Sequence, residues 1–278
     1  MSSGFREAGG DRGDIGSNPE RIEWNDVRMT GTTDGLRRFT GHEETPGDPI
    51  TDSIHRLVLA GGRGSRAVLD DLSCALFNVV SDTGLAEQAL DVLAGAEPRT
   101  WIELDAALRS WTYGYHGPRS TPRAVAKMSN PLAVLLAACG RDGREREKAL
   151  AHPAMRVDAR LAPVLAIRTV DWVGAVRRRA LRTLAEALSG ADAAALRAVV
   201  PVAVRLGERH RGQALTDLVR DAVLRADAGT LHAVRRSEDL RARRFVLEVA
   251  LQAGRMDREQ LVEAALVDDH RIPQLELP

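Results

Sequence analysis

Aromatic side chains gather in one short segment, where they could bind a partner by packing or stacking. Trp111, Tyr113, Tyr115 and His116 lie close together beside glycines, and the segment holds both tyrosines of the chain. Aromatic side chains offer a large contact area at a small entropic cost, which makes them common anchors at interfaces. The segment is therefore our first candidate binding site. The alternative is that it fills the junction between two groups of helices.

Basic side chains are concentrated between residues 118 and 188, with 14 Arg and Lys against six Asp and Glu, although the whole chain has a formal charge of zero. Arg178, Arg179 and Arg182 are candidates for a basic face that meets phosphate groups or an acidic protein. The other interpretation is an ordinary solvated helix face. Successive helical residues lie about 100° apart, so Arg177, Arg178 and Arg179 cannot share one surface. We interpret Arg177 as a residue that hydrogen-bonds between repeats.

A glycine-rich segment, residues 57–66, could in principle bind phosphate. Amides around Gly62 and Gly64 would form the cradle if an apolar strand preceded them. No second strand or carboxylate pair is recognisable downstream, so we interpret the segment as a link between two helices.

Other catalytic and metal-binding patterns lack support in the sequence. The seven histidines are dispersed, none is beside Cys74 or Cys139, and no serine lies in a Gly-x-Ser-x-Gly elbow. We therefore predict no catalytic residue, no cofactor and no metal. The apolar run that contains Cys139 favours burial of its thiol.

The composition indicates a helical protein of the cytoplasm. The longest apolar run, residues 131–139, is too short to span a bilayer, and the chain has only two cysteines and no recognisable secretion signal. We expect no membrane association and no disulfide scaffold.

The elements that would position these candidates are all helices. We expect a disordered or loosely packed arm over residues 1–49, an irregular helical cluster over 50–118 and helical repeats over 119–278. Cap residues predict several helix starts, among them Asn130-Pro131, Asp171, Asp192 and Asp239. Pro163 and Pro201 lie inside helical patterns, where proline kinks a helix.

The helix predicted from Asp171 carries the most specific pattern. Its apolar stripe is formed by Val173, Val176, Ala180, Leu184 and Leu188. Arg177, Ala180 and Leu184 recur as Arg211, Ala214 and Leu218 and then as Arg243, Val246 and Ala250, and Arg146 and Ala149 precede them. The intervals of 34, 32 and 31 residues correspond to two helices each.

This skeleton resembles the second helix of a HEAT repeat. The chain is similar to uncharacterised HEAT-type proteins of actinobacteria, to which its preference for Arg over Lys also corresponds. The resemblance implies an α-solenoid of helix pairs and a role for the Asp and the Arg in the turns.

Two functions are compatible with this architecture. The first is a non-catalytic scaffold or adaptor that binds a protein partner. The alternative is a nucleic-acid-binding protein or a HEAT-like DNA glycosylase that uses the basic face of residues 118–188, with Trp172 beside Asp171. The sequence leaves the oligomeric state open.

Overall fold

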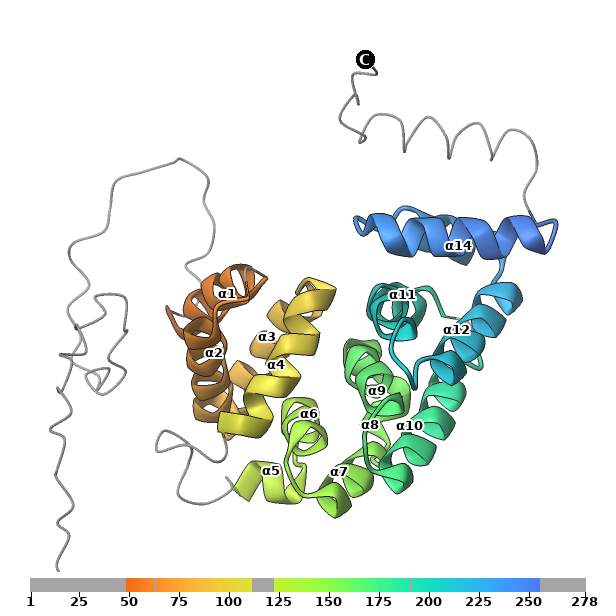
Figure 1. Cartoon of the computed structure of the whole chain (residues 1–278). Coiled ribbons are helices and arrows are strands. Elements are labelled where there is room, and N and C mark those ends of the chain that lie inside the picture. The colour runs from red at the N-terminus through yellow and green to blue at the C-terminus, as the bar shows by residue number, and fades with distance from the viewer. Residues whose placement is uncertain (1–48, 63, 112–122, 191, 256–278) are drawn as a thin grey trace, which may run out of the picture. The chain divides into compact units, whose positions relative to one another are not determined.

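The computed structural model describes residues 49–62, 64–111, 123–190 and 192–255, and these residues form helices without a β-strand (Figure 1). The predicted all-helical fold is thus confirmed over this part of the chain. The predicted N-terminal arm lies outside the described residues except for Pro49, which begins the first helix. No helix among the described residues combines the length and the apolar character needed to cross a membrane.

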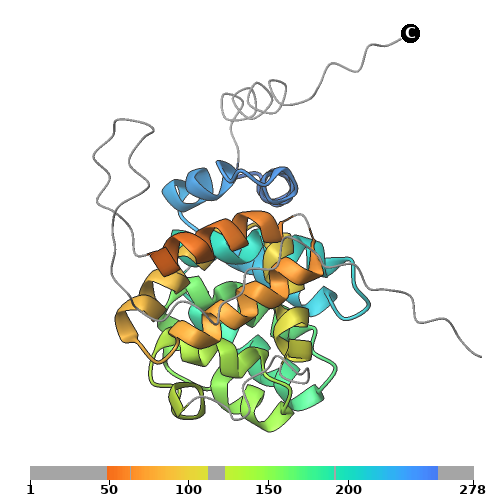
Figure 2. The same cartoon turned by 90° about the vertical axis from the view of Figure 1, so that its left-hand side faces the viewer.

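Four helices make up the N-terminal cluster: α1 (Pro49–Gly61), α2 (Arg66–Val79), α3 (Thr83–Ala94) and α4 (Pro98–Trp111). Figure 2 shows α1 and α2 in orange on the side that faces the viewer. Helix α1 packs on α2 and α3, and α2 packs on α4. Buried leucines such as Leu72, Leu76 and Leu90 fill the space between them. Residues 57–61 belong to α1, so the glycine-rich segment links two helices and follows no strand.

The remaining helices follow as a series of pairs after the short α5 (Arg123–Lys127). The four pairs are α6 (Pro131–Cys139) with α7 (Gly143–Leu150), α9 (Ala162–Thr169) with α10 (Gly174–Ala187), α11 (Ala193–Gly207) with α12 (Gln213–Arg225), and α13 (Ala228–Arg235) with α14 (Leu240–Gln252). The short α8 (Ala154–Val157) and the 3₁₀ helix η2 (Ala159–Leu161) connect the first two pairs.

Each pair packs on the next pair along the chain. The second helices contact one another in the order α7, α10, α12 and α14, and the first helices do so in the order α6, α9, α11 and α13. Hydrogen bonds also join successive second helices: the Thr183 hydroxyl donates to the carbonyl of Leu150, 33 residues earlier, and Arg220 donates to Gln252, 32 residues later. The first helices α6, α9 and α11 also pack on α4.

The apolar stripe predicted for α10 is confirmed, since Val176, Ala180, Leu184 and Leu188 are fully buried. Val173 is half-buried and precedes the helix. The prediction that Asp171 is the N-cap is wrong by two residues, because the N-cap of α10 is Val173 and the helix begins at Gly174.

Proline has a different role from the predicted one in α9. Pro163 lies in the first turn of α9, where its missing N–H removes no helical hydrogen bond, so it begins a helix rather than kinking one. Pro201 does lie inside α11.

Helix starts that depend on a local cap are confirmed. The side chains of Asn130, Asp192 and Asp239 accept hydrogen bonds from N–H groups in the first turns of α6, α11 and α14. Such caps satisfy amides that have no partner within the helix.

Candidate functional site

An arginine closes three of the four turns that join the helices of a pair. In each case the fourth residue of the second helix donates from Nη1 to the carbonyl oxygens five and six residues before it, at distances between 2.6 and 3.3 Å. These residues are Arg146, Arg177 and Arg243. Arg177 therefore donates its hydrogen bonds within the turn of its own pair. The sequence-based interpretation of Arg177 as a residue that hydrogen-bonds between repeats is wrong for these bonds.

The turn between α11 and α12 is built differently. Arg211 precedes α12 and is exposed, so the predicted repeat register fails there. The fourth residue of α12 is Thr216, whose hydroxyl donates to the carbonyl of Gly212. A Cβ atom on Gly212 would lie 2.3 Å from the carbonyl oxygen of Leu206, so only glycine permits this close approach of the backbone. Backbone contact replaces the arginine in this turn.

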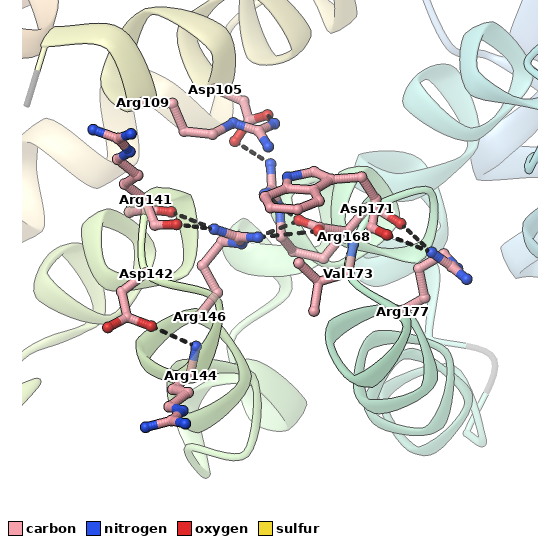
Figure 3. Close-up of polar contacts among 12 residues, drawn as sticks. Asp105, Arg109, Arg141, Asp142, Arg144, Arg146, Arg168, Asp171, Val173 and Arg177 are labelled. Carbon is pink, nitrogen blue, oxygen red and sulfur yellow. Dashed lines mark hydrogen bonds and ion pairs between the residues drawn. The ribbon is translucent and has the colours of Figure 1, made fainter. Parts of the chain in front are cut away.

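A buried network of charged groups connects α4, α7 and α9 at the turn before α10 (Figure 3). The Asp171 carboxylate accepts from Nε and Nη2 of Arg146, both at 3.1 Å, from Nη1 of Arg168 at 2.8 Å and from the N–H of Val173 at 2.9 Å. Arg168 also forms an ion pair with Asp105 of α4. The side chains of Arg168 and Asp171 are both 0% exposed, so these pairs are shielded from water.

The network favours the charged forms of Asp171 and Arg168 through their pKa values. Burial alone would raise the pKa of Asp171, but the N–H of Val173 and the guanidinium groups of Arg168 and Arg146 outweigh it and lower that pKa. Burial also opposes the charge on Arg168, yet the carboxylates of Asp105 and Asp171 keep its pKa above the ordinary value. The Asp171 carboxylate is fully engaged inside the protein and is not available to a substrate.

Burial also determines the character of the Cys139 thiol, which lies near this network at the end of α6. Loss of hydration raises its pKa to about 12, and the nearby carboxylate of Asp105 adds to the effect. The expected burial of Cys139 is confirmed, and its sulfur is a protonated thiol at neutral pH.

Trp172 projects from the turn that the network anchors. Trp172 is 67% exposed, whereas Trp101 is buried. The guanidinium carbon of Arg146 lies 5.9 Å from the centre of the Trp172 ring, which is within cation–π distance.

Of the site residues predicted from the sequence, the structure describes the side chains of the three arginines. Arg178 and Arg182 are exposed on α10, one helical turn apart, and Arg179 is half-buried. The side chain of Trp111 and the whole of Tyr113, Tyr115 and His116 lie outside the described residues. The structure therefore gives no geometry for the aromatic segment.

A cleft of about 850 Å³ lies elsewhere, between the N-terminal cluster and the later pairs. It is lined by the turn from α3 to α4, the first turn of α4, η2, the start of α9, one face of α11 and the turn from α13 to α14. Small side chains, among them Ala159, Ala194 and Ala198, leave room in it. Arg178, Arg179 and Arg182 do not line this cleft.

Charged groups in the cleft fall into two kinds. Arg160 is held by Asp158, Asp91 and Glu87 at 2.6 to 2.8 Å, and Arg205 pairs with Asp239 at 2.7 Å. Hydrogen bonds from Asp158 above all, and from Asp91 and Glu87, raise the pKa of Arg160 against the effect of its partial burial. Arg160 and Arg205 therefore line the cleft with their charges already paired to carboxylates of the protein.

Arg197 and Arg236 also line the cleft, and both are exposed and form no ion pair with another described residue. Glu97 and Glu238 are exposed in the same lining. The cleft therefore offers charged groups of both signs that form no ion pair with a described residue, together with small apolar side chains.

Sequence reasoning missed the cleft because its parts are distant along the chain. One signal was present: Ala194, Arg197, Ala198, Pro201 and Arg205 recur at helical spacing and mark one face of α11. The spacing alone does not indicate whether another helix packs on this face of α11.

Comparison of the chain with protein-family models, curated proteins and solved structures found no match. The interpretation of the cleft and of the turns therefore depends on the contacts of this chain itself.

Proposed function

We propose that the chain is an α-solenoid of HEAT-like helix pairs that acts as a non-catalytic scaffold for a protein partner in the cytoplasm. The successive packing of four helix pairs supports this proposal, as do hydrogen bonds between positions 32 and 33 residues apart. Stacked helix pairs form extended surfaces that repeat proteins use for binding.

The cleft along α11 is the observation that carries the proposed function. Small side chains in its lining leave space for the side chains of a partner, and exposed charged residues of the same lining can pair with groups of either sign: Arg197, Arg236, Glu97 and Glu238. Protein interfaces combine apolar contacts with hydrogen bonds and charged pairs. A segment of another protein that lies along α11 could make both kinds of contact.

Site-specific photo-crosslinking tests this function. A photoreactive amino acid is introduced at Ala198 in the cleft or, as the control, at the exposed Ala185 on α10. We expect Ala198 to give a discrete adduct with one protein in cells, and Arg197→Glu to remove it. The exposed Arg182 provides the matched control, since Arg182→Glu should leave the adduct unchanged. Equal adducts from both positions, or an adduct that survives Arg197→Glu, would contradict the proposal.

Nucleic-acid binding is the second candidate function. The observation in its favour is that Arg178 and Arg182 are both exposed, lie one turn apart on α10 and form no ion pair with a described residue. Phosphates on a backbone could pair with both. The buried Asp171 cannot serve as the carboxylate of a glycosylase in this conformation, so the candidate is restricted to binding.

A further inference from the structure

We propose that Trp172, Arg178 and Arg182 form a second interaction surface, the Trp172 surface, which binds an acidic protein segment carrying an aromatic or aliphatic side chain. None of the three residues lines the cleft. The inference therefore goes beyond the proposed function and stands or falls independently of it.

The first observation is the exposure of a large apolar ring. Trp172 is 67% exposed, although the turn around it is fixed by hydrogen bonds of Asp171 and Arg177. Tryptophan is the residue type most enriched among the side chains that dominate binding energy at interfaces. An apolar side chain of a partner could cover the ring.

The second observation is that the turn holds Trp172 in place. The carboxylate of Asp171 accepts from the N–H of Val173 at 2.9 Å, on the C-terminal side of the tryptophan. Arg177 donates to the carbonyl of Asp171 at 2.8 Å and to that of Trp172 at 3.1 Å. The guanidinium of Arg146 lies against the ring. A side chain presented in this way loses little conformational freedom on binding, which favours affinity.

The third observation is the positive charge on the first turns of α10, which follow Trp172 in the chain. Arg178 extends over Gly174, two residues after Trp172, with Nη1 only 3.4 Å from the position that a Cβ atom would occupy there. Arg182 follows one turn later, and neither arginine has an ion-pair partner among the described residues. These two guanidinium groups make the surface complementary to carboxylates.

Neighbouring carboxylates do not neutralise this charge. Asp171 is buried among arginines, and Glu186, one turn beyond Arg182, pairs with Arg156 at 3.3 Å. Asp142 of the adjacent turn caps α7 by accepting from the N–H of Arg144. Apart from Arg146, which pairs with Asp171, α7 carries Arg144 and Lys148 against Glu145 and Glu147 and packs on α10. Arg178 and Arg182 therefore keep their positive charges without an ion-pair partner among the described residues.

Fluorine NMR of the full chain labelled with 5-fluorotryptophan tests the proposal. Trp172→Phe assigns the resonance of Trp172. The probes are a synthetic acidic peptide, Asp-Glu-Phe-Asp-Glu-Leu, the same peptide with alanine in place of phenylalanine and leucine, a lysine version of the first peptide, and a single-stranded oligonucleotide. We expect the first peptide to shift the Trp172 resonance in a saturable way and the other three to have little effect.

Charge reversal separates this surface from the cleft. Arg178→Glu and Arg182→Glu should each weaken binding of the acidic peptide by about twofold to fivefold, as loss of an exposed ion pair predicts. Arg197→Glu in the cleft should leave it unchanged. A Trp172 resonance that does not move with the acidic peptide at millimolar concentration would overturn the proposal, as would an equal or larger response to the lysine peptide or the oligonucleotide. Unchanged circular dichroism of each variant shows that the fold is intact.

Discussion

Asp171→Asn is the substitution to which the buried network should be most sensitive. The amide that replaces the carboxylate has nearly the same shape, but it removes the negative charge that faces Arg146 and Arg168. Arg146 is 1% exposed and Arg168 is 0% exposed, so water cannot replace the lost partner. Removing one partner of a buried ion pair costs about 3 to 5 kcal/mol of stability. We expect a loss in this range, because the carboxylate accepts three hydrogen bonds from the two guanidinium groups.

Asp142→Asn is the matched control in the preceding helix pair. Asp142 occupies the corresponding turn and caps α7 through one hydrogen bond from the N–H of Arg144, but it is exposed. Asparagine is as good a cap as aspartate, so the loss of stability should stay below about 1 kcal/mol. Urea unfolding followed by circular dichroism measures both changes. If Asp171→Asn costs no more than Asp142→Asn, the network does not hold the turns as we describe.

The same pair of variants predicts a dependence on pH. The pKa of Asp171 is lower in the folded protein than its ordinary value, so the stabilisation is present above that value and is lost as the pH falls through the folded pKa. The wild type should therefore lose stability below about pH 4. In Asp171→Asn this part of the acid sensitivity should be missing, whereas Asp142→Asn should retain it.

Three further predictions concern packing, reactivity and charge. Leu184→Ala should cost about 2 to 5 kcal/mol of stability in urea unfolding because Leu184 is completely buried, and a loss below about 1 kcal/mol would mean that the pairs are not packed there. Cys139, with its pKa near 12, should react with a thiol reagent at pH 8 only after unfolding, whereas the half-buried Cys74 should react slowly in the native protein, and rapid native labelling of Cys139 would show that α6 opens. If Arg178 and Arg182 bind nucleic acid, fluorescence anisotropy with duplex DNA should show affinity that falls steeply with salt and a slope that flattens on charge reversal, but we expect no specific binding at about 150 mM salt.

Features that depend on neighbours in the sequence were predictable. Asn130, Asp192 and Asp239 cap their helices because a short polar side chain reaches amides only two or three residues away. The buried stripe of α10 followed in the same way from the spacing of its apolar residues. Arg211 shows where such reasoning ends, since a backbone contact at Gly212 replaces the arginine that the repeat pattern implied.

Features that depend on long-range partners could not be read from the chain. Asp171 was expected to cap a helix, but its carboxylate is used mainly by Arg146, 25 residues away in sequence, and by Arg168. Arg168 and Asp105 meet only because α4 packs on α9. Arg197 and Arg236 likewise line the same cleft only because the helix pairs that carry them pack on one another.

Hydrogen–deuterium exchange of the complex formed by the photo-crosslinked partner tests the central claim most directly. If the partner docks in the cleft, exchange should slow along α11 and in residues 236–240, which line it, relative to the free protein. The second helices α10 and α12 should exchange as before. Protection confined to α10 and α12, with α11 unchanged, would contradict the assignment of the cleft as the docking site of the scaffold.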